Sequence, residues 1–135
     1  MTRRALLQVI AALGLAACTG SEGPVEPVWG KQPCAHCAMI LSDRRFGAQL
    51  RTDDGEHLFY DDVGCMVLDI DQRGLGAPRA WARDGRSGRW LDARTARYLA
   101  GAPSPMDFGF EARAADGVAW DDLRVAVTAK ARRDR

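Results

Sequence analysis

The sequence is short of the residues on which most hydrolytic enzymes depend. It contains only two histidines, His36 and His57, and no Gly-x-Ser-x-Gly turn that would present a serine nucleophile. No acid–base constellation can therefore be identified. The 19 basic and 18 acidic side chains nearly cancel, which leaves no basic field for nucleic acid. We expect a protein that is not an enzyme and does not bind nucleic acid.

The N-terminal apolar run is too short to cross a bilayer comfortably, for which about 20 residues are needed. It spans residues 5–17, follows Arg3 and Arg4, and ends in Leu-Ala-Ala directly before Cys18. This pattern is typical of a secretory signal peptide, and the cysteine makes it resemble the lipobox of bacterial lipoproteins. We expect residues 1–17 to be removed during export, and Cys18 to carry a lipid that anchors the protein on the periplasmic side of a membrane. An ordinary signal peptide with a chance cysteine is the alternative.

The mature chain divides into a tether, a small folded region and a tail. Residues 18–27 contain two prolines and two glycines, and they predict a flexible tether whose last nine residues would span about 17 Å. Residues 130–135 predict a charged, solvated tail. Residues 28–129 remain for one domain with a modest core.

Two similar segments divide this domain into halves, about 28–77 and 78–129. Each contains Phe-Gly, then an Asp-Gly pair, then an aromatic residue followed by Asp-Asp. The Asp-Gly pairs predict hairpin turns, and the paired aspartates at 61–62 and 121–122 predict helix N-termini. Each half is therefore predicted as strand, turn, strand and helix, and the domain as an α+β fold.

Local patterns give further elements. Between the halves, residues 79–83 and 89–91 predict strands, and Asp92 predicts the start of a short helix to Ala100, ended by Gly101. After the first aspartate pair, four apolar residues are spaced i, i+3, i+4 and i+7, which predicts a helix with one buried face. These residues are Val63, Met66, Val67 and Ile70.

The run from Cys34 to Met39, Cys-Ala-His-Cys-Ala-Met, concentrates sulfur in a few residues. Two cysteines separated by two residues can reach one ion from a single turn of loop. In an extended segment, Cys37 and Met39 point to the same face. Thiolate and thioether are soft donors that favour copper(I) over hard cations. The run therefore predicts a copper(I) site.

Further sulfur ligands can come from elsewhere in the chain. Met106 follows Pro105 just before the second Phe-Gly, as Met39 precedes the first. With the halves related by a pseudo-two-fold axis, Met106 would meet the thiolates at their junction. A gap-filling core role is the alternative. Cys65, in the first turn of a predicted helix, and His36, inside the cysteine pair, are possible further ligands, although buried cysteine is commonly structural.

Two other readings of the cysteines remain open. Cys34, Cys37 and Cys65 with His36 or His57 would make a closed Cys₃His zinc site. Alternatively, Cys34 and Cys37 could form a thiol–disulfide pair. Such enzymes place the motif at the start of a helix within a βαβ pattern, and the strand-like run that follows leaves little room for that helix.

These motifs together resemble NosL-type lipoproteins, which are accessory to the assembly of nitrous oxide reductase. The resemblance covers nearly all of the mature chain. It rests on the lipobox Cys18, Cys34-x-x-Cys37-x-Met39, the hairpin from Phe46 to Phe59, Tyr60-Asp61-Asp62-x-Gly64-Cys65, the Pro105-Met106 loop and the second hairpin.

The resemblance implies a duplicated ββαβ-type fold and copper(I) binding for delivery to the reductase. It points to Cys37 and Met106 as ligands. The chain departs from the family pattern in carrying Ala38, where glycine is usual, and in the additional Cys65. We therefore predict a lipid-anchored copper(I) metallochaperone for a copper enzyme, with ligands drawn from Cys34, Cys37, Met39 and Met106, and with Cys65 and His36 as further candidates.

Overall fold

The computed structural model describes residues 22–135, so the predicted signal peptide (1–17) and Cys18 lie outside the described residues. The described chain is a mixed α+β structure with two helices and two antiparallel sheets. The predicted α+β class is therefore confirmed.

The larger sheet presents one apolar face. Its strands are β1 (Ala48–Arg51), β2 (His57–Tyr60), β3 (Arg79–Arg83) and β4 (Trp90–Asp92), and a short 3-10 turn, η1 (Arg44–Phe46), precedes them. They lie in the order β2-β1-β3-β4. Leu50 of β1 pairs with Leu58 and with Ala80, and these three buried side chains share a face because side chains alternate along strands. The predicted hairpin and the strand over 79–83 are confirmed.

Helix α1 (Val63–Arg73) covers that apolar face. It begins where the Asp62 carboxylate accepts a hydrogen bond from the Gly64 N–H, and it ends at Gly74 in the left-handed conformation. The predicted helix face is confirmed, because all four of its apolar residues are buried: Val63, Met66, Val67 and Ile70.

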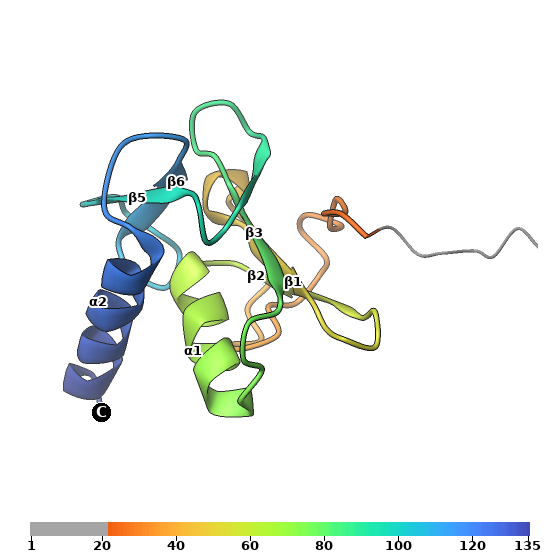
Figure 1. Ribbon diagram of the computed structural model, residues 1–135, viewed down its shortest axis with the longest axis horizontal. Coiled ribbons are helices and arrows are strands. Elements are labelled where there is room, and N and C mark those ends of the chain that lie inside the picture. Colours follow the sequence, from red (N-terminus) through yellow and green to blue (C-terminus); the bar gives the residue numbers. More distant parts are fainter. Residues whose placement is uncertain (1–21) are drawn as a thin grey trace, which may run out of the picture.

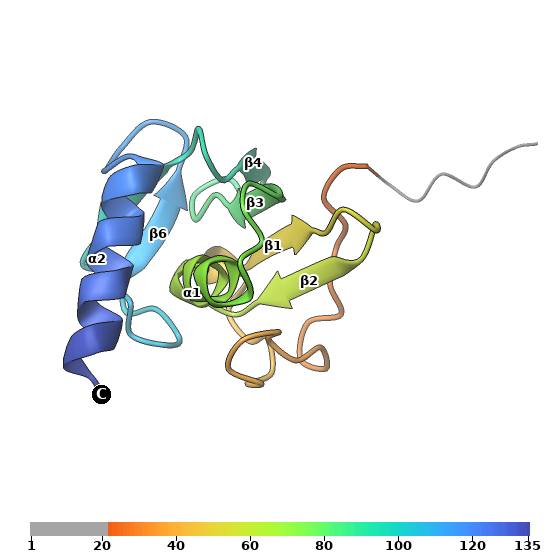
Figure 2. The same ribbon diagram turned by 60° about the horizontal axis from the view of Figure 1, so that its bottom comes forward.

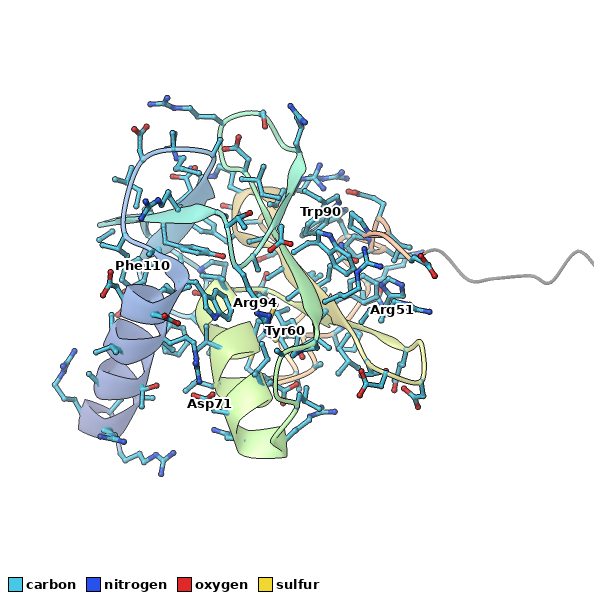
Figure 3. The ribbon with its side chains drawn as sticks, viewed as in Figure 1. Arg51, Tyr60, Asp71, Trp90, Arg94 and Phe110 are labelled. Carbon is cyan, nitrogen blue, oxygen red and sulfur yellow. The ribbon has the colours of Figure 1, made fainter. Side chains whose placement is uncertain are left out.

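The second sheet contains two strands, β5 (Arg97–Ala100) and β6 (Phe110–Arg113), followed by helix α2 (Trp120–Arg133). Figures 1 and 2 both show α1 between the four-stranded sheet and α2. Arg124 of α2 donates a 2.9 Å hydrogen bond to Asp71 of α1, and Figure 3 labels Asp71 between the two helices. None of the described helices is long and apolar enough to cross a membrane.

The predicted helix from Asp92 to Ala100 is wrong. Asp92 caps a single turn, with its side chain accepting from Arg94 N–H at 2.8 Å, and the chain then extends into β5. The buried side chain of Tyr98 pairs across the sheet with Ala112. Pairing with β6 therefore overrides the local helix signal.

The second half differs from the first after its hairpin turn. The chain turns at Gly117, and Val118 forms only an isolated bridge to Tyr98 in place of a full strand. The second aspartate pair lies inside the first turn of α2, whose N-cap is Ala119. Helix α2 continues to Arg133, so most of the predicted tail, residues 130–135, is the exposed end of this helix.

The last part of the predicted tether is docked on the domain. We call residues 22–29 the strap. The backbone of Val25 makes two hydrogen bonds with the fully buried side-chain amide of Gln49. The Val25 N–H donates to Gln49 Oε1 at 2.9 Å, and Gln49 Nε2 donates to the Val25 carbonyl at 2.8 Å. Glu26 accepts from Arg83 at 2.8 Å and from Trp90 at 3.2 Å. Figure 3 shows Trp90 close to the start of the described chain. The prediction of a flexible tether over all of 18–27 is therefore wrong for the described part.

Candidate metal centre

Three thiols, two from one loop and one from a later helix, meet at one place. The sulfur atoms of Cys34, Cys37 and Cys65 all lie within 4.8 Å of one another, and none of the three is in a disulfide. Cys34 is 3% exposed and Cys65 is 0% exposed, whereas Cys37 is half-buried. Sulfur ligands bind a metal at about 2.3 Å, so small side-chain movements would bring all three onto one ion. This cluster can hold a metal ion.

The loop that carries Cys34 and Cys37 is closed by its own backbone. The Cys34 N–H donates to the Met39 carbonyl at 2.7 Å, and the Ala38 N–H donates to the Cys34 carbonyl at 3.0 Å. Ala38 has a φ of 64°, in the left-handed region that favours glycine. The Ala35 N–H donates to the carbonyl of Phe59 at 2.8 Å, which holds the loop beside the end of β2.

Cys65 reaches the cluster from the first turn of α1. The helix begins directly after β2, so its first residues lie next to the loop that β2 holds. Cys65 lies off the apolar face predicted for this helix and is nevertheless fully buried. Phe108 packs against the same turn so closely that a Cβ at Gly64 would lie 2.2 Å from its ring. The helix start is therefore enclosed on more than one side.

The three thiols are electrostatically unequal. The pKa of Cys34 is lowered to about 5, mainly because its sulfur accepts a hydrogen bond from the Cys65 thiol. Burial acts in the opposite direction, and backbone N–H groups, including that of Cys37, lower the pKa further. The same hydrogen bond, together with burial, raises the pKa of Cys65. Burial is also the main cause that raises the pKa of Cys37. The cluster therefore combines one favoured thiolate with two thiols.

Met39 and Met106 line a common cleft beside the cluster. The cleft has a volume of about 570 Å³, and Met39 is 57% exposed in it. None of the three cysteines lines it, but it borders their surroundings at Ala38, the residue after Cys37, and at Asp61, whose backbone hydrogen-bonds to Cys34. Its lining is mostly apolar and consists of Ala38, Met39, Ile40, Ser42, Asp43, Asp61, Pro103, Pro105 and Met106. The structure thus brings the two predicted methionines to one surface.

Asp61 and Asp62 connect the segments that carry sulfur. Asp61 accepts from the Ser42 N–H at 3.0 Å. Asp62 accepts from the Gly64 N–H at 2.9 Å with one oxygen and from the Met106 N–H at 3.1 Å with the other. Burial is the main cause that raises the pKa of both carboxyl groups. Sequence reasoning assigned this pair only to helix capping, because the partners in the two loops are distant in sequence.

The side chain of His36 does not join the thiol cluster, although the residue lies between two of the cysteines. Its Nδ1 is 3.9 Å from Asp69, and among the described residues only the three cysteines form the metal-competent group. Asp69 also accepts from the Tyr60 hydroxyl at 2.7 Å and from Arg73 at 2.8 Å. Figure 3 shows Tyr60 beside α1. His57 stacks on Phe59 at the opposite end of β2.

No family model, curated protein or solved structure matches this chain.

Proposed function

We propose that this protein is a non-enzymatic metallochaperone that binds one copper(I) ion and passes it to a copper enzyme. The observation that carries the proposal is the convergence of the sulfur atoms of Cys34, Cys37 and Cys65 within 4.8 Å. Met39 and Met106, in the adjoining cleft, supply thioethers that can join or replace a thiolate. An ion held partly by exposed ligands can be handed over by stepwise ligand exchange.

The donor set favours copper(I) over zinc. Structural zinc is almost always tetrahedral and takes four ligands from cysteine, histidine and carboxylate. Within the described residues, no fourth ligand of these types joins the three thiols. Thiolates and thioethers are the ligands that select copper(I). Zinc remains the second candidate because the same three thiolates would bind it.

We further propose that the protein acts outside the cytoplasm, anchored by a lipid on Cys18. The small-residue cleavage site before Cys18 supports this proposal. The NosL-type motifs favour nitrous oxide reductase as the recipient and a duplicated ββαβ-type origin for the fold. The hairpin–helix order of the first half, β1-β2-α1, agrees with that origin.

The test is an anaerobic copper(I) titration against a competing chelator. The protein would be the mature chain from residue 18 with Cys18→Ser, so that only the three clustered thiols remain. We expect one ion per chain and a weakening of at least about tenfold for each Cys→Ser variant of the cluster. Met66→Leu is the matched control, because Met66 is a thioether buried in the helix core. Tighter binding of zinc than of copper(I) would refute the proposal.

The affinity should also depend on pH. Thiols must lose their protons to bind the ion, so protons compete with copper(I) and the apparent affinity falls as the pH falls. Repeating the titration at several pH values measures this dependence. Removal of the ion with excess chelator should restore the spectrum that the empty protein has at the same pH, and a pH-independent affinity would exclude thiolate ligation.

A further inference from the structure

The carboxylate of Asp62 joins two segments that both contribute to the sulfur site. Its first oxygen caps α1 through the Gly64 N–H, next to Cys65. Its second oxygen accepts from the backbone N–H of Met106, 44 residues further along the chain. Asp62 is fully buried, and among the described residues no ion pair involves it.

Helix capping alone does not explain a carboxylate at this position. Asparagine and serine cap helices about as well as aspartate, and neither places a full charge in the interior, where it is costly without a counter-charge. What aspartate adds is a second acceptor oxygen. In this structure that oxygen is used on the Met106 loop.

The Met106 loop is built around this contact. The hydroxyl of Ser104 donates to the Asp62 carboxylate and accepts from the Gly109 N–H at 2.8 Å. Asp107, the residue after Met106, has a left-handed φ of 59°. The loop is therefore folded on itself, and Asp62 fixes it against the start of α1.

We propose that Asp62 is a positioning residue for the metal ligand Met106, an inference that rests on the proposed copper(I) site. By holding the Met106 backbone at the cleft, Asp62 places a thioether in the cleft that borders the cysteine loop before the ion arrives. The residue itself does not touch the ion. Its effect on affinity passes through Met106.

A double-mutant cycle tests this role in the mature chain with Cys18→Ser. Asp62→Asn keeps one acceptor oxygen for the helix cap but cannot also accept from Met106. We expect Asp62→Asn to weaken copper(I) binding about 10–100-fold, as is usual for residues that orient ligands. Met106→Ala should weaken binding by a similar factor. The double variant should be no weaker than either single variant.

Two controls separate positioning from a general loss of stability. Asp84→Asn makes the same chemical change at another buried carboxylate, which holds the turn at Arg86 and Ser87, and should leave copper(I) affinity unchanged. Ser104→Ala loosens the Met106 loop but keeps the Asp62 carboxylate that caps the helix. It should weaken binding in the wild-type background and have no further effect in Met106→Ala, even if Asp62→Asn fails to fold.

The NMR signal of the Met106 methyl group gives an independent readout. Copper(I) should shift this signal strongly in the unmodified chain and only weakly in Asp62→Asn or Ser104→Ala. Additive losses of affinity, or an undiminished methyl shift, would overturn the positioning role and leave the copper site intact. A chain that does not bind copper(I) through its cysteines would overturn the proposed function and this inference with it.

Discussion

At the scale of single residues, Ala38 is held in a conformation that its side chain disfavours. Its φ of 64° lies in the left-handed region, which costs an L-residue roughly 1–2 kcal/mol. The backbone that closes the loop between Cys34 and Met39 imposes it. Glycine would adopt this conformation without that cost.

We predict that Ala38→Gly stabilises the protein. The relief of strain should exceed the greater flexibility of glycine in the unfolded chain, for a net gain of about 0.5–1 kcal/mol in the free energy of unfolding. Urea denaturation measures it. Ala35→Gly, in the same loop but without a positive φ, should instead lower stability by about 0.5–1 kcal/mol. Loss of stability in both variants would contradict the prediction.

The separate site residues were predictable to different degrees. Cys34 and Cys37 follow from a local spacing, and the structure brings them together. Cys65 joins them only because β2 leads directly into α1 beside their loop, a long-range relation. Its place in the first turn of a predicted helix was the local signal for it. His36 was a candidate by position, yet it faces Asp69.

At the scale of elements, the start of α1 and the Met106 loop are in close contact. A Cβ on Gly64 would lie 2.2 Å from the ring of Phe108, so the lack of a side chain at Gly64 lets the loop approach the helix. Asp62 hydrogen-bonds to both sides of this contact, to the Gly64 N–H at the start of α1 and to the Met106 N–H in the loop.

We predict that Gly64→Ala separates these two elements. Overpacking costs about 1–3 kcal/mol, which outweighs the gain of up to about 1 kcal/mol from alanine in a helix. Thermal unfolding should show that the free energy of unfolding of Gly64→Ala is lower than that of the wild-type protein by about 1–2 kcal/mol. The affinity for copper(I) should fall as well. Gly23→Ala is the control, since no atom lies within 4 Å of its Cβ position. Unchanged stability in Gly64→Ala would mean that Phe108 moves aside freely.

Most elements followed from local patterns, and the exceptions have a physical reason. The Asp-Gly turn, the helix after Asp62 and the strand over 79–83 each carried their own periodicity or turn signal. The segment from Asp92 to Ala100 carried cap signals that fit a single turn as well as a helix. Its pairing with β6 decides the outcome, and that pairing is not local.

At the scale of the whole molecule, the strap closes over the face of the large sheet that lies opposite α1. Glu26 is its anchor. Its half-exposed carboxylate accepts from Trp29 at 2.6 Å, Trp90 at 3.2 Å and Arg83 at 2.8 Å. The guanidinium of Arg83 lies 5.7 Å from the Trp29 ring and 5.3 Å from the Trp90 ring. The composition of this segment resembles that of a linker. Its docking was not predicted, because its partners are distant in sequence.

We predict that Glu26→Gln removes an acid-sensitive part of the stability. Burial opposes ionisation, but the hydrogen bonds from Trp29, Trp90 and Arg83 hold the pKa of Glu26 below its ordinary value of 4.5. The ionised carboxylate therefore stabilises the fold above pH 4.5, and this stabilisation is lost as the pH falls through the lower folded-state pKa. Denaturation across pH 3–7 should show that the free energies of unfolding of the wild-type protein and of Glu26→Gln become equal at the acid end of this range. A constant difference would contradict the prediction.

The docked strap also sets how far the domain would stand from a membrane. Residues 19–24 separate Cys18 from Val25, whose backbone is hydrogen-bonded to Gln49 of the domain. Even fully extended, the seven residue steps from Cys18 to Val25 span at most about 25 Å. A lipid on Cys18 would thus keep the domain within a narrow range of heights, and a recipient enzyme would have to present its own metal site at that height.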